Sequence, residues 1–182
     1  QAYMNMGETA ENLAKKYKVS REEQEKFAAL SHQKAAKARE AGKFKDEIVP
    51  INGIAEDGTI RPETTAEGLA GLKLAFDENG TVTAGTASPL TDGTAAVLVC
   101  SEAYADKHKL PKLARIVSVG VAGCAAEIMG IGPVPSSQKA LQRAGLKMSD
   151  MDIVEVNEAF AAQSIPVIRD LGIDESKLNL DG

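Results

Sequence analysis

Asn157 is the polar residue whose position most directly suggests chemistry. It follows a short β-branched run at residues 153–156, which is typical of a buried strand, and precedes alanine-rich residues that favour a helix. An asparagine at such a junction can cap the helix, with Glu158 stabilising the positive end of the helix dipole. The same position also places a carboxamide at the end of a core strand, where open α/β sheets bind ligands and a fixed donor can hold a water or polarise a carbonyl. The residue type alone favours the cap and leaves the second interpretation open.

The cysteines and histidines form no recognisable pair of nucleophile and base. Cys124 lies in a glycine-rich stretch between an expected strand and helix, whereas Cys100 ends an apolar run and is expected to be a packing residue. The two histidines, His32 and His108, lie in polar helical segments far from Cys124 in the sequence, and His32 is expected at the surface. No base is therefore identifiable for a cysteine nucleophile, and the same shortage of ligands argues against a metal site.

The glycine-rich stretch before residue 133 has part of the pattern of a dinucleotide-binding loop. Gly130 and Gly132 precede an expected helix, and Asp150 follows at about the spacing of the ribose-binding acid in the fingerprint. The third glycine of the fingerprint would fall at Pro135. We therefore do not predict a dinucleotide site.

The composition describes a chain that can bury an aliphatic core. It has 182 residues, 43% hydrophobic and 4% aromatic with no Trp, which suggests one domain or slightly more. A net charge of −5 argues against nucleic acid as the main partner. No apolar run is long enough for a membrane span, and two unpatterned cysteines favour a reducing, cytoplasmic location. Because the sequence begins with Gln1, without a signal peptide, we expect a piece cut from a longer chain.

The elements that must position these groups alternate along the chain, which predicts an α/β fold. Helices are expected near residues 8–17, 20–41 (opened by a Ser20 to Glu23 capping box), 66–72, 101–109, 134–144 and 158–171. Strands are expected near residues 44–51, 81–88, 94–100, 113–121 and 152–156, with another beginning at 178. The polar, glycine-rich stretch 56–72 is typical of surface segments that carry binding groups, and Arg61 is its candidate.

Six motifs in one order and spacing resemble the thiolase family, which includes acetyl-CoA acetyltransferases and 3-ketoacyl-CoA thiolases. They are MGETAEN at 6–12, SREEQ at 20–24, GTVTAG at 80–85, DG at 92–93, MGIGP at 129–133 and NEAFA at 157–161. The resemblance covers essentially the whole chain and identifies it as an internal fragment of such a protein.

The resemblance implies a thiolase-like α-β-α-β-α layered fold that is incomplete here. Residues 1–79 would form part of the loop domain, 80–110 the end of the N-terminal core half, and 111–182 the first part of the C-terminal core half. The change in composition at Gly80 agrees with the first of these boundaries.

The resemblance also implies a role for particular residues. Asn157 would hold the water of an oxyanion hole for the thioester oxygen. The substrate-binding residues would be Met6, Met129 and Phe160 around the acyl and pantetheine pocket, Ser88 on the pantetheine arm, and Arg61 near the CoA nucleotide. Coenzyme A would be a substrate, with no permanently bound cofactor, and the complete protein would be a homodimer or homotetramer.

Three catalytic groups of the family have no counterpart in the 182 residues: the nucleophilic cysteine, the histidine of a Gly-His-Pro segment and a second, acid/base cysteine. Neither Cys100 nor Cys124 aligns with them. We therefore expect a parent acyltransferase that catalyses thiolytic cleavage or Claisen condensation, and an isolated piece that is inactive. The alternative is a non-catalytic homologue that binds CoA or lipid.

Overall fold

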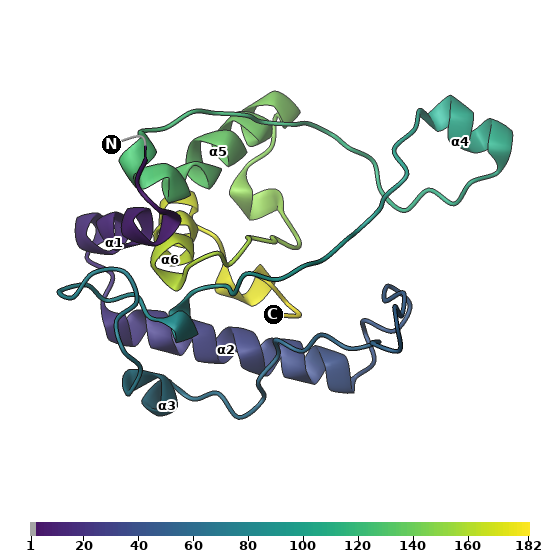
Figure 1. The fold of residues 1–182 in the computed structure, drawn as a ribbon. Coiled ribbons are helices and arrows are strands. Elements are labelled where there is room, and N and C mark those ends of the chain that lie inside the picture. The colour runs from purple at the N-terminus through teal and green to yellow at the C-terminus, as the bar shows by residue number, and fades with distance from the viewer. Residues whose placement is uncertain (1–2) are drawn as a thin grey trace.

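The computed structural model describes residues 3–182, and its regular elements are helices. In chain order they are α1 (Met6–Tyr17), α2 (Arg21–Glu40), α3 (Ala66–Ala70), η1 (Ala84–Thr86), α4 (Glu102–His108), η2 (Ala126–Ile131), α5 (Pro133–Ala144), η3 (Met148–Asp150), α6 (Ala161–Leu171) and η4 (Glu175–Lys177), where η marks a 3₁₀ helix. Figure 1 shows α1, α5 and α6 gathered together, α2 running beneath them, and α4 lying apart on a long extended excursion.

Local signals predicted most of the helices correctly. The capping box before α2 is confirmed, because Ser20 Oγ accepts from the Glu23 amide at 3.2 Å and Glu23 Oε2 accepts from the Ser20 amide at 2.9 Å. The helix ends at Glu40, and Gly42 follows with a φ of +73°, a conformation that favours glycine. Asn5 caps α1 in the same reciprocal way with Glu8.

The predicted helix 158–171 begins later than expected, and this changes the roles of two residues. Its first residue is Ala161, and Phe160 before it is extended, with φ −147° and ψ 136°. Phe160 stays extended because it forms an antiparallel bridge with Ala87. Asn157 and Glu158 therefore precede the first turn, and their predicted roles as helix cap and dipole partner are wrong.

The predicted strands do not form a sheet within residues 3–182. Only isolated bridges occur there, including the parallel bridge between Val154 and Leu178. Residues 94–100 and 113–121 are extended and, apart from the half-buried Ser118 and Gly120, exposed, and residues 44–47 form turns. A strand needs a neighbour to satisfy its amides and carbonyls, and no described segment pairs with these runs. The layered α-β-α-β-α arrangement is therefore not formed by residues 3–182 alone.

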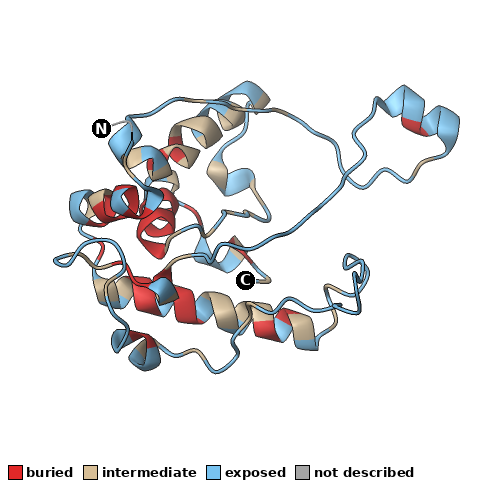
Figure 2. Ribbon diagram, viewed as in Figure 1, coloured by how far each residue is buried: buried red, intermediate tan, exposed pale blue. Residues whose placement is uncertain are grey.

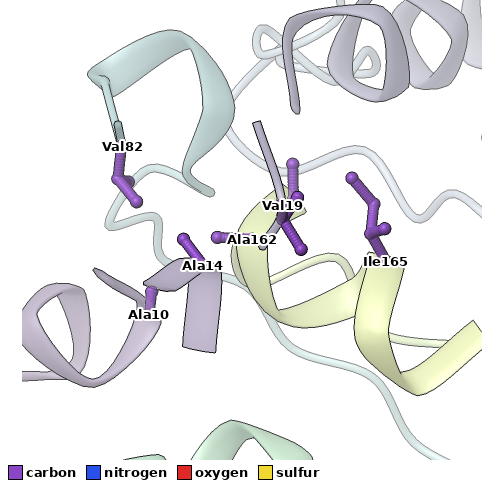
Figure 3. Close-up of a cluster of buried hydrophobic side chains, with 7 residues drawn as sticks. Ala10, Ala14, Val19, Val82, Ala162 and Ile165 are labelled. Atoms are coloured by element: carbon purple, nitrogen blue, oxygen red, sulfur yellow. The ribbon is translucent and has the colours of Figure 1, made fainter. Parts of the chain in front are cut away.

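The core joins helices from opposite ends of the chain. Its largest cluster is aliphatic, as the composition predicted, and consists of Ala10, Ala14, Val19, Val82, Ala161, Ala162 and Ile165. Figure 3 shows how the labelled side chains of this cluster converge between α1, α6 and the segment that carries Val82. A second cluster packs Leu13 of α1 against Ile131, Val134 and Val167. Figure 2 shows the buried residues concentrated on α1, α6 and parts of α2, whereas the excursion bearing α4 is almost wholly exposed.

A buried carboxylate fixes the segment that leads to η1. Glu11 of α1 accepts hydrogen bonds from the amides of Thr81, at 2.9 Å, and Val82, at 2.8 Å. Gln24 of α2, which is fully buried, donates to Thr81 Oγ1 at 2.9 Å. These contacts hold residues 81–88 between α1 and α2, next to the segment around Asn157.

Candidate functional site

Two hollows meet at one wall, and four residues line both of them. The larger hollow has a volume of about 870 Å³ and the smaller one about 430 Å³. The residues common to both, called the shared wall below, are Met6, Asn157, Ala159 and Phe160. Three of the six residues predicted for the site therefore lie together on this wall.

Asn157 lies on the shared wall with its carboxamide available to a ligand. It is exposed, and within residues 3–182 its side chain makes no hydrogen bond to protein. Its backbone carbonyl accepts a long hydrogen bond of 3.5 Å from the buried Ser164 hydroxyl of α6. A carboxamide that is not used by the fold can donate to a water or to a ligand oxygen.

The segment bearing Ser88 runs along the segment that bears Phe160. The Ser88 amide donates to the Ala159 carbonyl at 2.9 Å, next to the bridge between Ala87 and Phe160. Ser88 is exposed and lines the larger hollow. The Phe160 ring meets the Phe76 ring edge-to-face, with centroids 5.9 Å apart and an interplanar angle of 75°. Phe76 also lines the larger hollow, although no motif or spacing indicated it.

The two predicted methionines flank the smaller hollow from different elements. Met6 begins α1 and Met129 lies in η2, and both line this hollow. They are 57% and 47% exposed, so they present apolar, adaptable surface that the fold does not bury. The remaining lining of the smaller hollow is largely aliphatic and comes from α1 and α6, among other elements.

Arg61 lies beside the larger hollow and not on its wall. Its backbone amide donates to His32 Nδ1 at 3.3 Å, and His32 does line the hollow. Burial lowers the pKa of His32 below its usual 6.5, and the Arg61 charge lowers it further, whereas Glu158 and Glu63 oppose the shift. The expectation of a surface histidine is wrong, because His32 is half-buried. Its spacing from Ala28 and Ala36, both buried on α2, was the available signal, since residues four apart share a helix face.

A hydrogen-bonded group that the sequence did not reveal supports the segment around Asn157. Glu158 accepts from the Ser31 hydroxyl of α2 at 2.5 Å and from the Asn179 amide nitrogen at 2.6 Å. Asn179 also bonds to both backbone groups of Val156. Nothing in the local pattern could have indicated these contacts, because they join residues that are distant in sequence.

The cysteines show no arrangement for nucleophilic catalysis within residues 3–182. Both are unpaired and exposed, so the prediction that Cys100 is a packing residue is wrong. It is exposed because the extended run that precedes it has no neighbour to pack against. Cys124 Sγ donates to the Met129 carbonyl at 3.5 Å, and neither thiol contacts a histidine. The described residues also contain no cluster of three or more metal-binding side chains, and no described helix is long and apolar enough to cross a membrane.

Comparison with known proteins matches two successive family profiles to the chain. Residues 1–103 match the N-terminal domain of thiolase, and residues 110–182 match the C-terminal domain of thiolase. Among curated relatives, a 3-ketoacyl-CoA thiolase from Marinobacter nauticus is 54% identical and one from Vibrio cholerae is 55% identical, each over 97% of this chain and 49% of the relative. The chain thus spans about half the length of the curated relatives it matches.

Solved structures with similar folds show the same partial coverage. Human mitochondrial 3-ketoacyl-CoA thiolase in complex with CoA superposes with a TM-score of 0.94 at 50% identity, over 97% of this chain and 46% of that one. The dimeric peroxisomal thiolase of Saccharomyces cerevisiae superposes with a TM-score of 0.96 at 43% identity, over 100% of this chain and 48% of that one. The helices and extended segments described above therefore have the arrangement of about half of a thiolase.

Proposed function

This chain belongs to the thiolase family, and from that premise we propose that it forms part of an acyltransferase that cleaves 3-ketoacyl-CoA with coenzyme A, or joins acyl groups in the reverse direction. The observation that carries the proposal is the Asn157 carboxamide, which no described residue engages and which lies where the two hollows meet. The names of the relatives, 3-ketoacyl-CoA thiolases, favour this substrate class.

In the proposed reaction, Asn157 holds a water that donates to the thioester oxygen. Negative charge grows on that oxygen when the bond between Cα and the β-carbonyl carbon breaks or forms, because the thioester side becomes an enolate. A fixed donor stabilises this charge more than it stabilises the neutral ground state, and one well-placed donor contributes about 3 to 4 kcal/mol. The site needs no resident cofactor for this step, since coenzyme A is itself a substrate.

The other walls suit the remaining parts of the substrate. Met6, Met129 and Phe160 offer apolar surface to the acyl chain and the pantetheine, and the exposed Ser88 hydroxyl offers a hydrogen bond to an amide of the pantetheine arm. We assign Arg61 to the CoA nucleotide, because its exposed guanidinium lies beside the larger hollow and complements phosphate.

We further propose the architecture and assembly that the family implies. Residues 1–79 would belong to the loop domain, 80–110 to the N-terminal core half and 111–182 to the C-terminal core half of a five-layered fold. The yeast relative is a dimeric thiolase, which supports a homodimer or homotetramer for the complete protein. A cytoplasmic location stays a prediction from cysteine usage.

We propose that the 182 residues alone do not turn over substrate. Within residues 3–182 neither cysteine has a base, so the chain offers no activated nucleophile to take up the acyl group. A homologue that binds CoA without catalysis is the second candidate, favoured by the same lack of a base beside either described cysteine.

The test is Asn157→Ala in the complete protein that contains this chain, assayed for thiolysis of 3-ketoacyl-CoA. Loss of the oxyanion donor is expected to lower kcat by about 100- to 1,000-fold. Asn79→Ala is the control, because Asn79 is exposed, lines neither hollow and does not have a positive φ. A complete protein that binds CoA but cleaves no 3-ketoacyl-CoA would refute the catalytic proposal and establish the binding alternative.

A further inference from the structure

We propose that Asn179 is a positioning residue that fixes Asn157 by holding the residues on both sides of it. The inference rests on the proposed function, because it gives Asn179 an effect on catalysis only through Asn157. Its basis is a set of three hydrogen bonds from one buried side chain.

The Asn179 side chain forms hydrogen bonds with the residues immediately before and after Asn157. On the preceding residue, Asn179 Oδ1 accepts from the Val156 amide at 2.8 Å and Nδ2 donates to the Val156 carbonyl at 2.9 Å. On the following residue, Nδ2 donates to Glu158 Oε1 at 2.6 Å. Asn157 is thus the residue between two clamped neighbours.

The chemistry of the contacts fixes which way the Asn179 amide faces. A carboxylate only accepts hydrogen bonds, so the amide nitrogen must be the atom nearest Glu158. That orientation leaves the oxygen for the Val156 N–H, and both amide hydrogens have an acceptor. Asn179 is 3% exposed, so these bonds are shielded from water and costly to leave unmade.

The backbone of Asn179 is also adapted to this position. Its φ is +41°, in the left-handed region that few residues other than glycine and asparagine adopt. The Asn179 amide donates to the Val154 carbonyl at 3.0 Å, beside the parallel bridge between Val154 and Leu178. The backbone of Asn179 pairs with Val154, and its side-chain amide then bonds to the backbone of Val156 as the next residue of a paired strand would.

The contacts of Asn179 with Val156 and Glu158, called the clamp below, are continued by contacts to α2, which also lines the larger hollow. Glu158 Oε2 accepts from the Ser31 hydroxyl at 2.5 Å, and Lys34 Nζ donates to the Leu178 carbonyl at 2.8 Å. A shift of the segment around Asn157 would break contacts on two elements together. A displacement of about 1 Å at a catalytic group can cost about 100-fold in rate, so the clamp has consequences for turnover.

The first experiment compares Asn179→Gly with Asn52→Gly in the complete protein. Glycine removes the side chain and tolerates positive φ, and Asn52 is an exposed asparagine with a φ of +54°. For Asn179→Gly we expect kcat to fall by roughly 10- to 100-fold while KM changes by less than about threefold. Asn52→Gly should retain wild-type kcat. An unchanged kcat in Asn179→Gly overturns the proposal.

A double variant tests whether Asn179 acts through Asn157. If it does, Asn157→Ala with Asn179→Gly should lie within about twofold of Asn157→Ala alone, since the positioned group is already absent. A further loss in the double variant as large as that of Asn179→Gly alone would show an independent effect and overturn the positioning role.

Reversing the direction of the hydrogen bond between residues 179 and 158 tests whether lost activity can be restored. Asn179→Asp places two carboxylates where the structure has a donor and an acceptor 2.6 Å apart, so its kcat should fall at least as far as that of Asn179→Gly. Adding Glu158→Gln restores the bond between residues 158 and 179, because Gln Nε2 can donate to the new carboxylate while Oε1 accepts from Ser31; the bond to the Val156 carbonyl stays lost, so the rescue is partial. We expect the pair to regain about tenfold over Asn179→Asp, and no regain would overturn the clamp.

Hydrogen exchange separates failure of the clamp from failure of the proposed function. If the complete wild-type protein has no thiolase activity, the proposed function fails and the catalytic role of Asn179 fails with it. If the protein is active but Asn179→Gly leaves exchange at the Val156 amide at the wild-type rate, the clamp alone is refuted. Faster exchange there, without a change at α1, together with the loss of kcat, supports it.

Discussion

At the level of single residues, the position of the Phe76 ring in the larger hollow requires that residue 7 has no side chain. A Cβ there would lie 2.2 Å from Cδ1 of Phe76, and the Phe76 ring in turn packs on Phe160. Gly7→Ala therefore has to displace the Phe76 ring, and we expect a loss of about 1 to 3 kcal/mol in unfolding free energy with a raised KM for 3-ketoacyl-CoA.

The measurement is denaturant unfolding and steady-state kinetics of the complete protein. Gly58→Ala is the matched control, because a Cβ at Gly58 would meet no atom within 4 Å. Equal stability and KM in the two variants would mean that Phe76 moves without cost, contrary to this account.

Asn157 could be predicted from the sequence as a site residue, whereas its helix-cap role was predicted wrongly and Asn179 could not be predicted. Asn157 was selected because its type and its position after a β-branched run were both visible in the sequence. Its assignment as a helix cap was wrong because the bridge from Ala87 keeps Phe160 extended, and that contact spans the chain. The positioning residue Asn179 could not be predicted for the same reason: the partners of its side chain lie more than 20 residues away, so each of its side-chain hydrogen bonds is non-local.

At the scale of elements, the capping boxes make a quantitative prediction. Ser20→Ala removes the hydroxyl that accepts from the Glu23 amide, and it should lower the unfolding free energy by about 1 kcal/mol, since α2 packs against α6 and α3. Ser101 caps α4 by the same bond, to the Tyr104 amide, but α4 lies apart from the rest of the chain. Ser101→Ala should therefore leave the unfolding midpoint unchanged. Equal effects of the two substitutions would contradict the arrangement in Figure 1.

Helices and strands differed in how far the sequence could predict them. The helical bonds of α2 and α5 join residues four apart, and their capping and terminating residues are adjacent in sequence, so their limits followed from local pattern. Residues 94–100 and 113–121 have strand-like composition, but a strand exists only with a neighbour. Local composition therefore predicted correctly that these two runs are extended, but it could not show whether each run has a neighbouring strand.

At the scale of the whole molecule, the exposed apolar segments predict self-association of the 182-residue chain. Val97 is 88% exposed and Leu113 is 95% exposed, in extended runs with unpaired backbone groups. Such edges pair with other chains, so we expect concentration-dependent oligomers in analytical ultracentrifugation. Val97→Lys with Val117→Lys should reduce this association. A wild-type chain that sediments as a single monomeric species at all concentrations would refute the expectation.

The family was indicated by the order and spacing of motifs, whereas the helices and strands were predicted from local periodicity. Six motifs in register indicated thiolase, whereas periodicity alone indicated only an α/β protein. Spacing between motifs reports the fold of the ancestor as a whole, including contacts that the local pattern of this chain does not encode.

The packing of α1 against α6 has a consequence for modularity. The two family profiles divide the sequence between residues 103 and 110, yet Ala10 and Ala14 from one side share a core with Ala161 and Ala162 from the other. The profile boundary therefore separates units of ancestry and not units of stability. A chimera that joined the N-terminal part of one relative to the C-terminal part of another would pair an α1 and an α6 that had not been selected to pack together. An exchange at this boundary should therefore also carry over the contact residues of the partner helix.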